Sequence, residues 1–99
     1  MLVRHTNRTL QRIDDDPEYN GRLGLNVASA FQTLMLNIRA ADNENDLRAM
    51  KSLHFEKLKG KRQHEYSMRV NKQFRLIFQI EKVDRRNQLV ITDLEDDHS

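Results

Sequence analysis

Residues 53–80, LHFEKLKGKRQHEYSMRVNKQFRLIFQI, carry the pattern that decides the fold. Apolar and polar residues alternate over 66–70 and again over 74–80, which is typical of strands with one buried face. A polar tripeptide that begins with Asn71 separates the two runs. Because asparagine tolerates positive φ, we expect Asn71 at a tight turn. The segment therefore predicts two antiparallel strands joined by a short connection.

Downstream, a polar turn over 84–87 leads into a last predicted strand over 89–92. Upstream, the sequence is helical in character. Val27, Phe31, Leu34 and Ile38 recur at the spacing of one helix face, and we expect that face in the core. A short helix is predicted over 44–51, with an asparagine cap and acidic residues in its first turn.

The N-terminus predicts a short edge strand over 1–4, followed by a helix capped by Thr6 or Asn7. The fold class is therefore α+β, with N-terminal helices packed on a small antiparallel β-sheet. With 99 residues, no repeat and no Gly/Pro-rich linker, we expect a single domain over 1–99. One sheet face then packs on the helices and the other faces water. Strand alternation predicts Ser67, Arg69 and Arg75 on that outer face.

The positive charge is concentrated in one part of the chain. Residues 51–86 carry eleven Lys/Arg against four Asp/Glu, whereas residues 87–99 carry none against four. A basic cluster of this kind attracts polyanions, because each cation that meets a phosphate releases condensed counterions. It also fits the solvated face of a highly charged small protein. Charge alone leaves both interpretations open.

Several classes of function have no support in the sequence. It has no cysteine, no apolar run long enough to span a bilayer and no apolar core of a signal peptide at its N-terminus. It also lacks a glycine-rich phosphate loop, a nucleophile elbow and a two-histidine zinc spacing. We therefore expect a cytoplasmic protein with no metal site and no cofactor.

Three motifs in order resemble those of HigB toxins, part of the RelE/ParE toxin superfamily: LHFEKLKG at 53–60, YSMRVN at 66–71 and QFRLIF at 73–78. The acidic end of the chain, VITD at 90–93 followed by DDH at 96–98, resembles the terminal segment of that family. The resemblance is close over about 45 residues and weaker over the N-terminal half. It implies the two-layer RelE/ParE fold.

The same resemblance implies the toxin of a type II toxin–antitoxin system that cleaves translated messenger RNA in the 30S A site of the ribosome. The implied partners are a helix-turn-helix antitoxin of the HigA kind, mRNA and the ribosome, with operator DNA bound only through the antitoxin. Cleavage without a metal needs a proton acceptor for the 2′-hydroxyl, cations around the phosphate and a donor for the leaving 5′-oxygen. The implied product is a 2′,3′-cyclic phosphate.

The candidate site residues follow from the resemblance together with this chemistry. Imidazoles titrate near neutral pH and suit the acid and base roles, while lysine and arginine suit the phosphate. The candidate catalytic residues are His54, Lys57, Arg69, Arg75 and His98, and the candidate RNA-binding residues are Lys59, Lys61, Arg62, Lys72 and Asp97.

One position departs from the family pattern. Asp97 precedes the terminal His98, where the family usually has an aromatic residue that can stack on a base. An aspartate there repels phosphate unless it orients a histidine. Two alternatives therefore stay open: a ParE-like toxin that inhibits DNA gyrase without cleaving RNA, and a catalytically weakened toxin fold that acts only through its antitoxin complex.

Overall fold

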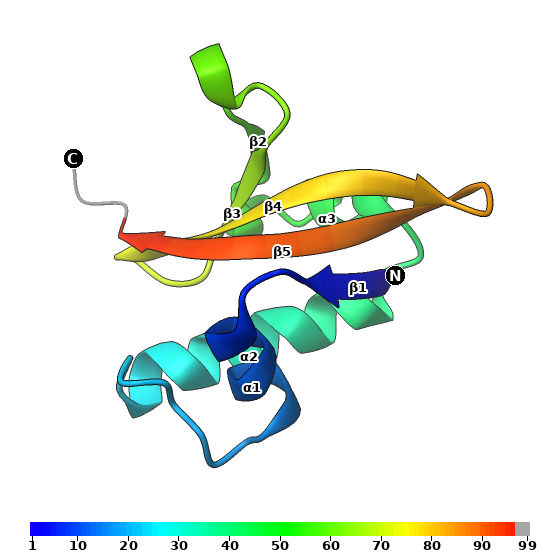
Figure 1. Ribbon diagram of the computed structural model, residues 1–99. Coiled ribbons are helices and arrows are strands. Elements are labelled where there is room, and N and C mark those ends of the chain that lie inside the picture. The colour runs from blue at the N-terminus through cyan, green and yellow to red at the C-terminus, as the bar shows by residue number, and fades with distance from the viewer. Residues whose placement is uncertain (97–99) are drawn as a thin grey trace.

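The computed structural model describes residues 1–96, and its framework is a five-stranded sheet in the order β1-β5-β4-β3-β2. The long antiparallel hairpin of β4 (Phe74–Val83) and β5 (Arg86–Asp96) forms the middle of the sheet. β3 (Tyr66–Arg69) and the short edge strand β2 (Glu56–Lys57) continue it on one side. In Figure 1, β2 and the 3-10 helix η2 (Gly60–Arg62) extend away from the rest of the sheet.

The first strand makes the sheet mixed. β1 (Leu2–His5) lies parallel to β5, with Val3 opposite Leu89, whereas the other strand pairs are antiparallel. Parallel neighbours need a long connection between them. Here that connection contains all the helices and the other three strands. The antiparallel arrangement of the remaining strands agrees with the prediction.

The last strand is longer than the predicted segment 89–92. The ladder between β4 and β5 shifts register between Ile77 and Phe78, and Thr92 lies at this bulge. The Thr92 hydroxyl donates to the Ile77 carbonyl at 3.2 Å. A bulge absorbs one extra residue and lets pairing resume beyond it. β5 therefore continues into polar residues that the alternation pattern did not mark as strand, as far as Asp96.

Two of the helices begin directly after predicted caps. α1 (Arg8–Asp15) is capped by Asn7, whose side chain accepts from the Leu10 amide. α2 (Leu25–Ala40) is the longest helix. α3 (Glu44–Ala49) is capped by Asn43. It is shorter than the predicted 44–51, because the chain then forms the 3-10 helix η1 (Lys51–Leu53).

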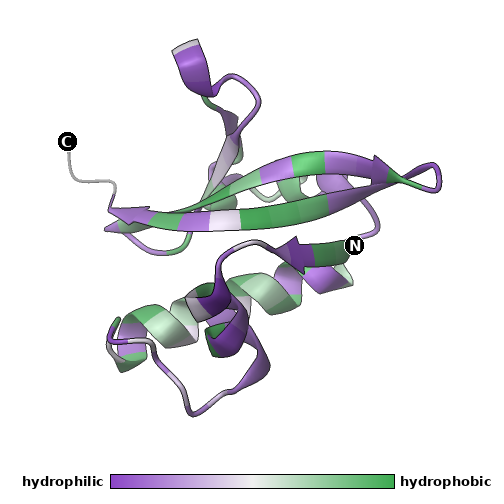
Figure 2. Ribbon diagram, viewed as in Figure 1, coloured by the Kyte–Doolittle hydropathy of each residue, from purple (hydrophilic) through white to green (hydrophobic). Residues whose placement is uncertain are grey.

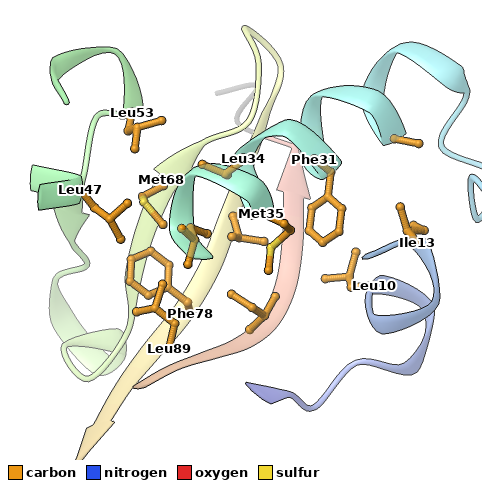
Figure 3. Close-up of a cluster of buried hydrophobic side chains, with 14 residues drawn as sticks. Leu10, Ile13, Phe31, Leu34, Met35, Leu47, Leu53, Met68, Phe78 and Leu89 are labelled. Carbon is orange, nitrogen blue, oxygen red and sulfur yellow. The ribbon is translucent and has the colours of Figure 1, made fainter. Parts of the chain in front are cut away.

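The core lies between the helices and one face of the sheet. Figure 2 shows apolar residues along the middle of β4 and β5, and Figure 3 shows the buried side chains between α2 and these strands. Phe31, Met35 and Ile38 of α2 are at most 1% exposed, as is Phe78 of β4. Burying side chains of this size contributes about 1.5–3 kcal/mol each. Truncating Phe31 to alanine should cost about 3–5 kcal/mol.

A partly buried ionic cluster joins three elements of the N-terminal half. His5 Nε2 of β1 lies 2.8 Å from Asp14 Oδ2 of α1, and the two side chains are 6% and 3% exposed. Arg39 of α2 donates to both oxygens of the same carboxylate. Burial opposes the ionisation of Asp14, but the hydrogen bonds from Arg39 and His5 outweigh it, so the pKa of Asp14 is lowered. The cluster fixes α1 against β1 and α2.

The connection between β3 and β4 uses Asn71 in a different way from the prediction. The expected positive φ is not found there: among residues 1–96, the non-glycine residues with positive φ lie elsewhere. Instead, the Asn71 side-chain oxygen accepts from the amides of Gln73 at 2.9 Å and Phe74 at 2.7 Å. Asparagine can stabilise a turn by such bonds to its own backbone. Asn71 therefore stabilises the turn through its side-chain oxygen and does not need a positive φ.

Candidate functional site

The face of the sheet opposite the helices, which we call the outer face, carries the predicted arginine pair. Arg69 of β3 lies directly opposite Arg75 of β4. Two residues earlier on β3, Ser67 lies opposite Ile77 on one side and opposite Glu56 of β2 on the other. Directly opposed residues of an antiparallel pair project from the same side of the sheet. The register therefore brings both arginines to one surface, as the alternation predicted.

A small pocket of about 80 Å³ opens on this face. It combines an imidazole, a carboxylate, a hydroxyl and two guanidinium groups from four segments of the chain. The serine is buried, at 3% exposure, whereas the histidine and Arg69 are exposed. The lining residues are His54, Glu56, Ser67, Arg69 and Arg75. Three of them are candidate catalytic residues from the sequence, so the fold brings together groups up to 21 positions apart.

An aromatic cluster fixes the two pocket residues that come from outside the central strands. Phe55 packs edge-on to Phe78, with ring centroids 5.3 Å apart, and lies 5.7 Å from the ring of Tyr66. The Arg48 guanidinium lies over the Phe55 ring, 4.4 Å from its centroid. Because Phe55 is anchored in this way, its neighbours His54 and Glu56 are held at the pocket.

The backbone at His54 takes an uncommon conformation. This residue ends η1 with φ 47°, in the left-handed region. For a non-glycine residue that conformation is uncommon and carries a small energetic cost. It turns the chain from η1 into β2, so that Glu56 pairs with Ser67. The turn is therefore part of what places both groups beside the arginines.

A carboxylate from β5 contacts the edge of the site. Glu95 lies opposite Arg75 in the β4–β5 ladder, and Arg75 donates to its Oε1 at 3.2 Å. Arg62 of η2 donates to both oxygens of Glu95, at 3.1 and 2.6 Å, and also to Glu65. The bond from Arg62 is the main reason that the pKa of Glu95 is lowered; burial opposes it and Arg75 adds to it. The same bonds raise the pKa of Arg62.

The remaining predicted residues are distributed around this site. Lys57 pairs with Tyr66, on the side of β2 opposite Glu56, and so does not share the outer face. Lys59 and Lys61 are exposed on the segment around η2, and Lys72 is exposed in the turn between β3 and β4. Asp97 and His98 lie outside the described residues.

Three residues of the site were not among the sequence candidates: Glu56, Ser67 as a pocket residue, and Glu95. The outward direction of Ser67 followed from strand alternation, but its place in a pocket depended on the register with β2. Glu95 was missed because the last strand was expected to end at Thr92. Alternation counted from the buried Leu89 and Ile91 would place Glu95 on the core face, and the bulge at Thr92 reverses that parity.

A larger groove lies away from this site. It has a volume of about 1030 Å³ and is formed by the start of β1, the end of α2, the start of α3 and the β4–β5 hairpin end. None of the candidate residues within 1–96 lines it. The groove has cations and carboxylates of its own, but the imidazole of His54 and the opposed arginine pair lie in the smaller pocket.

Within residues 1–96, no group of three or more His, Cys, Asp or Glu side chains is arranged to hold a metal ion. No helix in that range is long and apolar enough to cross a membrane.

Comparison with solved structures identifies the class of fold. A YoeB/ParE toxin from Agrobacterium tumefaciens matches with a TM-score of 0.63, over 99% of this chain and 100% of that chain, at 13% identity. The fold is therefore that of the RelE/ParE toxins. At this identity the likeness concerns the fold alone.

Sequence comparison identifies the family. The family model described as RelE-like toxin of type II toxin–antitoxin system HigB matches residues 4–97. The chain therefore belongs to this HigB-like toxin family. A Haemophilus influenzae protein described as uncharacterized is 46% identical over 50 residues. The match spans 50% of this chain and half the length of that curated relative.

Proposed function

We propose that this toxin is a metal-independent endoribonuclease that cleaves messenger RNA on the ribosome. The observation that carries the proposal is the outer-face pocket, in which His54 and Glu56 lie beside the opposed pair Arg69 and Arg75. Proton transfer and stabilisation of a charged phosphate are the two requirements of this reaction. Family membership supports the same reaction class.

The proposed reaction is an attack of the 2′-hydroxyl oxygen on the adjacent phosphorus. Glu56 accepts the hydroxyl proton while the new P–O bond forms. Arg69 and Arg75 bind the non-bridging oxygens, where negative charge develops. The bond to the 5′-oxygen breaks, and an imidazole, His54 or the family's terminal His98, donates a proton to that oxygen. The products are a 2′,3′-cyclic phosphate and a free 5′-hydroxyl.

The proposed setting is the cytoplasm, with the 30S A site as the place of cleavage. Lys57, Lys59, Lys61 and Lys72 are all exposed, and we propose that they contact the RNA backbone. The antitoxin is proposed to be a helix-turn-helix protein of the HigA kind, and contact with operator DNA is proposed to occur through it alone. We also propose that Asp97 contacts the RNA.

The central experiment maps new 5′ ends on an mRNA translated in a reconstituted system with the purified toxin. We expect new ends with wild type, and a loss of at least tenfold in their rate with Arg69→Gln. Arg8→Gln is the matched control, because Arg8 is an exposed arginine on α1, away from the pocket. Absence of new ends with wild type, or equal rates for the two variants, would overturn the proposal.

The chemistry is tested separately with a modified substrate. A single 2′-deoxy nucleotide at the mapped position removes the nucleophile, so cleavage there should stop. EDTA supplied as its Mg²⁺ complex removes Zn²⁺ and Mn²⁺, which EDTA binds more tightly, while ribosomal Mg²⁺ is held constant; this addition should leave the rate unchanged. A supercoiling assay with DNA gyrase tests the ParE-like alternative. Gyrase inhibition that survives in Arg69→Gln, without RNA cleavage by wild type, would favour that alternative.

A further inference from the structure

Glu95 connects the pocket to the basic segment around η2. Its Oε1 accepts from Arg75 on the neighbouring strand at 3.2 Å and from Arg62 at 3.1 Å, while its Oε2 accepts from Arg62 at 2.6 Å. One carboxylate thus contacts two arginines from separate parts of the chain. Arg62 lies in η2, between the exposed Lys59 and Lys61 on one side and β3 on the other.

The Arg75–Glu95 contact is better shielded from water than a surface ion pair, whereas the side chain of Arg62 is 39% exposed. The side chains of Glu95 and Arg75 are 27% and 28% exposed. The Arg4–Glu81 pair elsewhere on the sheet is more exposed, at 51% and 37%. Partial shielding from water strengthens the attraction between charges and reduces its dependence on salt. Glu95 therefore restrains the side chain of Arg75 more strongly than an exposed carboxylate would.

We propose that Glu95 is a positioning residue for RNA cleavage, which holds Arg75 toward the pocket and fixes η2 through Arg62. This inference rests on the proposed function for its kinetic consequences. The carboxylate does not touch the reacting atoms in this scheme. It sets the direction of the guanidinium that does.

The position of Glu95 has two opposite effects on the reaction. Its negative charge, beside the arginine that binds phosphate, weakens the binding of RNA in the ground state. Its hydrogen bonds limit the rotamers of two long side chains, so less conformational freedom is lost as the transition state forms. Removing the charge should therefore tighten substrate binding and slow the chemical step. A residue with only a structural role would not separate KM from kcat in this way.

Glu95→Gln is the central variant, because the amide keeps the shape but has one acceptor oxygen in place of two. We expect KM for ribosome-bound mRNA to fall by about threefold or more and kcat to fall by about tenfold, following the electrostatic and orientation arguments above. Glu81→Gln is the matched control. Glu81 also accepts from an arginine and a neighbouring side chain on this sheet, but it lies far along β4 from the pocket.

A second variant tests whether the effect of Glu95 on kcat arises through Arg75 or through η2. Glu65→Gln weakens one of the two carboxylate contacts of Arg62 and leaves the Arg75–Glu95 contact in place. We expect kcat within about twofold of wild type for this variant, because the orientation of Arg75 is kept. A kcat for Glu65→Gln as low as that for Glu95→Gln would overturn the assignment of the effect to Arg75.

A readout that does not need activity distinguishes failure of this inference from failure of the proposed function. The Arg75 Nε–H resonance, followed by NMR, should shift and broaden in Glu95→Gln but not in Glu81→Gln. Affinity for a ribosome-bound mRNA with a 2′-deoxy nucleotide at the cleavage position should rise in Glu95→Gln. An unchanged resonance with unchanged affinity would overturn the positioning role, even if wild type cleaves. The predicted shifts without any cleavage by wild type would overturn the nuclease proposal instead.

Discussion

Arg69 and Arg75 lie directly opposite each other across the β3–β4 ladder. Like charges in this arrangement destabilise a sheet by about 0.2–1 kcal/mol. The contact between Arg75 and Glu95 offsets part of this cost, and an anion bound on the outer face can offset more of it. Such a conflict between stability and local charge is typical of a site that binds a charged ligand.

Arg69→Gln should raise the free energy of unfolding by about 0.5 kcal/mol, because it removes this repulsion. Urea unfolding measures the change. Arg86→Gln is the control, since Arg86 also lies in a strand but opposite the uncharged Val83. A loss of stability in Arg69→Gln relative to that control would contradict the repulsion argument.

Asp14→Asn should reduce the free energy of unfolding at neutral pH by about 2 kcal/mol, because charged hydrogen bonds to His5 and Arg39 are weakened. The folded pKa of Asp14 lies below its ordinary value of 3.8. Its contribution is therefore present above pH 3.8 and is lost as the pH falls through the lower folded pKa.

Urea unfolding of wild type and Asp14→Asn from pH 7 to pH 2 checks the sign. The difference in stability should be constant at neutral pH and shrink below pH 3.8. Other carboxyl groups titrate in both proteins and so cancel in the difference. Asp15→Asn, at the exposed neighbouring position, should show little of this pH dependence. A difference that widens in acid would disprove the assignment.

Arg85→Gly should stabilise the protein by about 1 kcal/mol. Asp84 and Arg85 have φ 49° and 69° and form the two-residue turn between β4 and β5. A turn with two positive φ values favours Asn or Asp followed by glycine, and arginine is strained there. Thermal unfolding measures the gain. Arg86→Gly, one residue later and inside β5, should destabilise instead, because glycine weakens a strand.

Gly21→Ala should destabilise the protein more than Gly60→Ala, by about 1 kcal/mol or more. Both glycines have positive φ, at 59° and 72°, so both substitutions introduce backbone strain. At Gly21 the added Cβ would also lie 2.9 Å from Ile13 Cδ1, in the core, whereas at Gly60 nothing lies within 4 Å. Equal losses in parallel urea titrations would show that the contact with Ile13 is relieved without cost.

The sequence by itself determined most of the elements of this protein. Helical spacing marked the buried face of α2, and alternation marked β3, β4 and the outward direction of Arg69 and Arg75. The acidic first turn after Asn43 marked the start of α3. These predictions succeeded because each depends on residues within one element, where the period of the backbone alone decides which side chains are buried. The motifs at 53–78 also indicated the toxin family that the comparison confirmed.

Only the tertiary structure decided how the site is assembled. The parallel pairing of β1 with β5 joins residues 2–5 to residues 88–91, which lie far apart in the sequence. The bulge at Thr92 extends β5 far enough for Glu95 to reach Arg75. The register of β2 directs Glu56, and not Lys57, to the pocket. Registers and bulges depend on which strands pair and on how the strands are aligned. A shift of one residue in the register moves every side chain of a strand to the opposite face of the sheet.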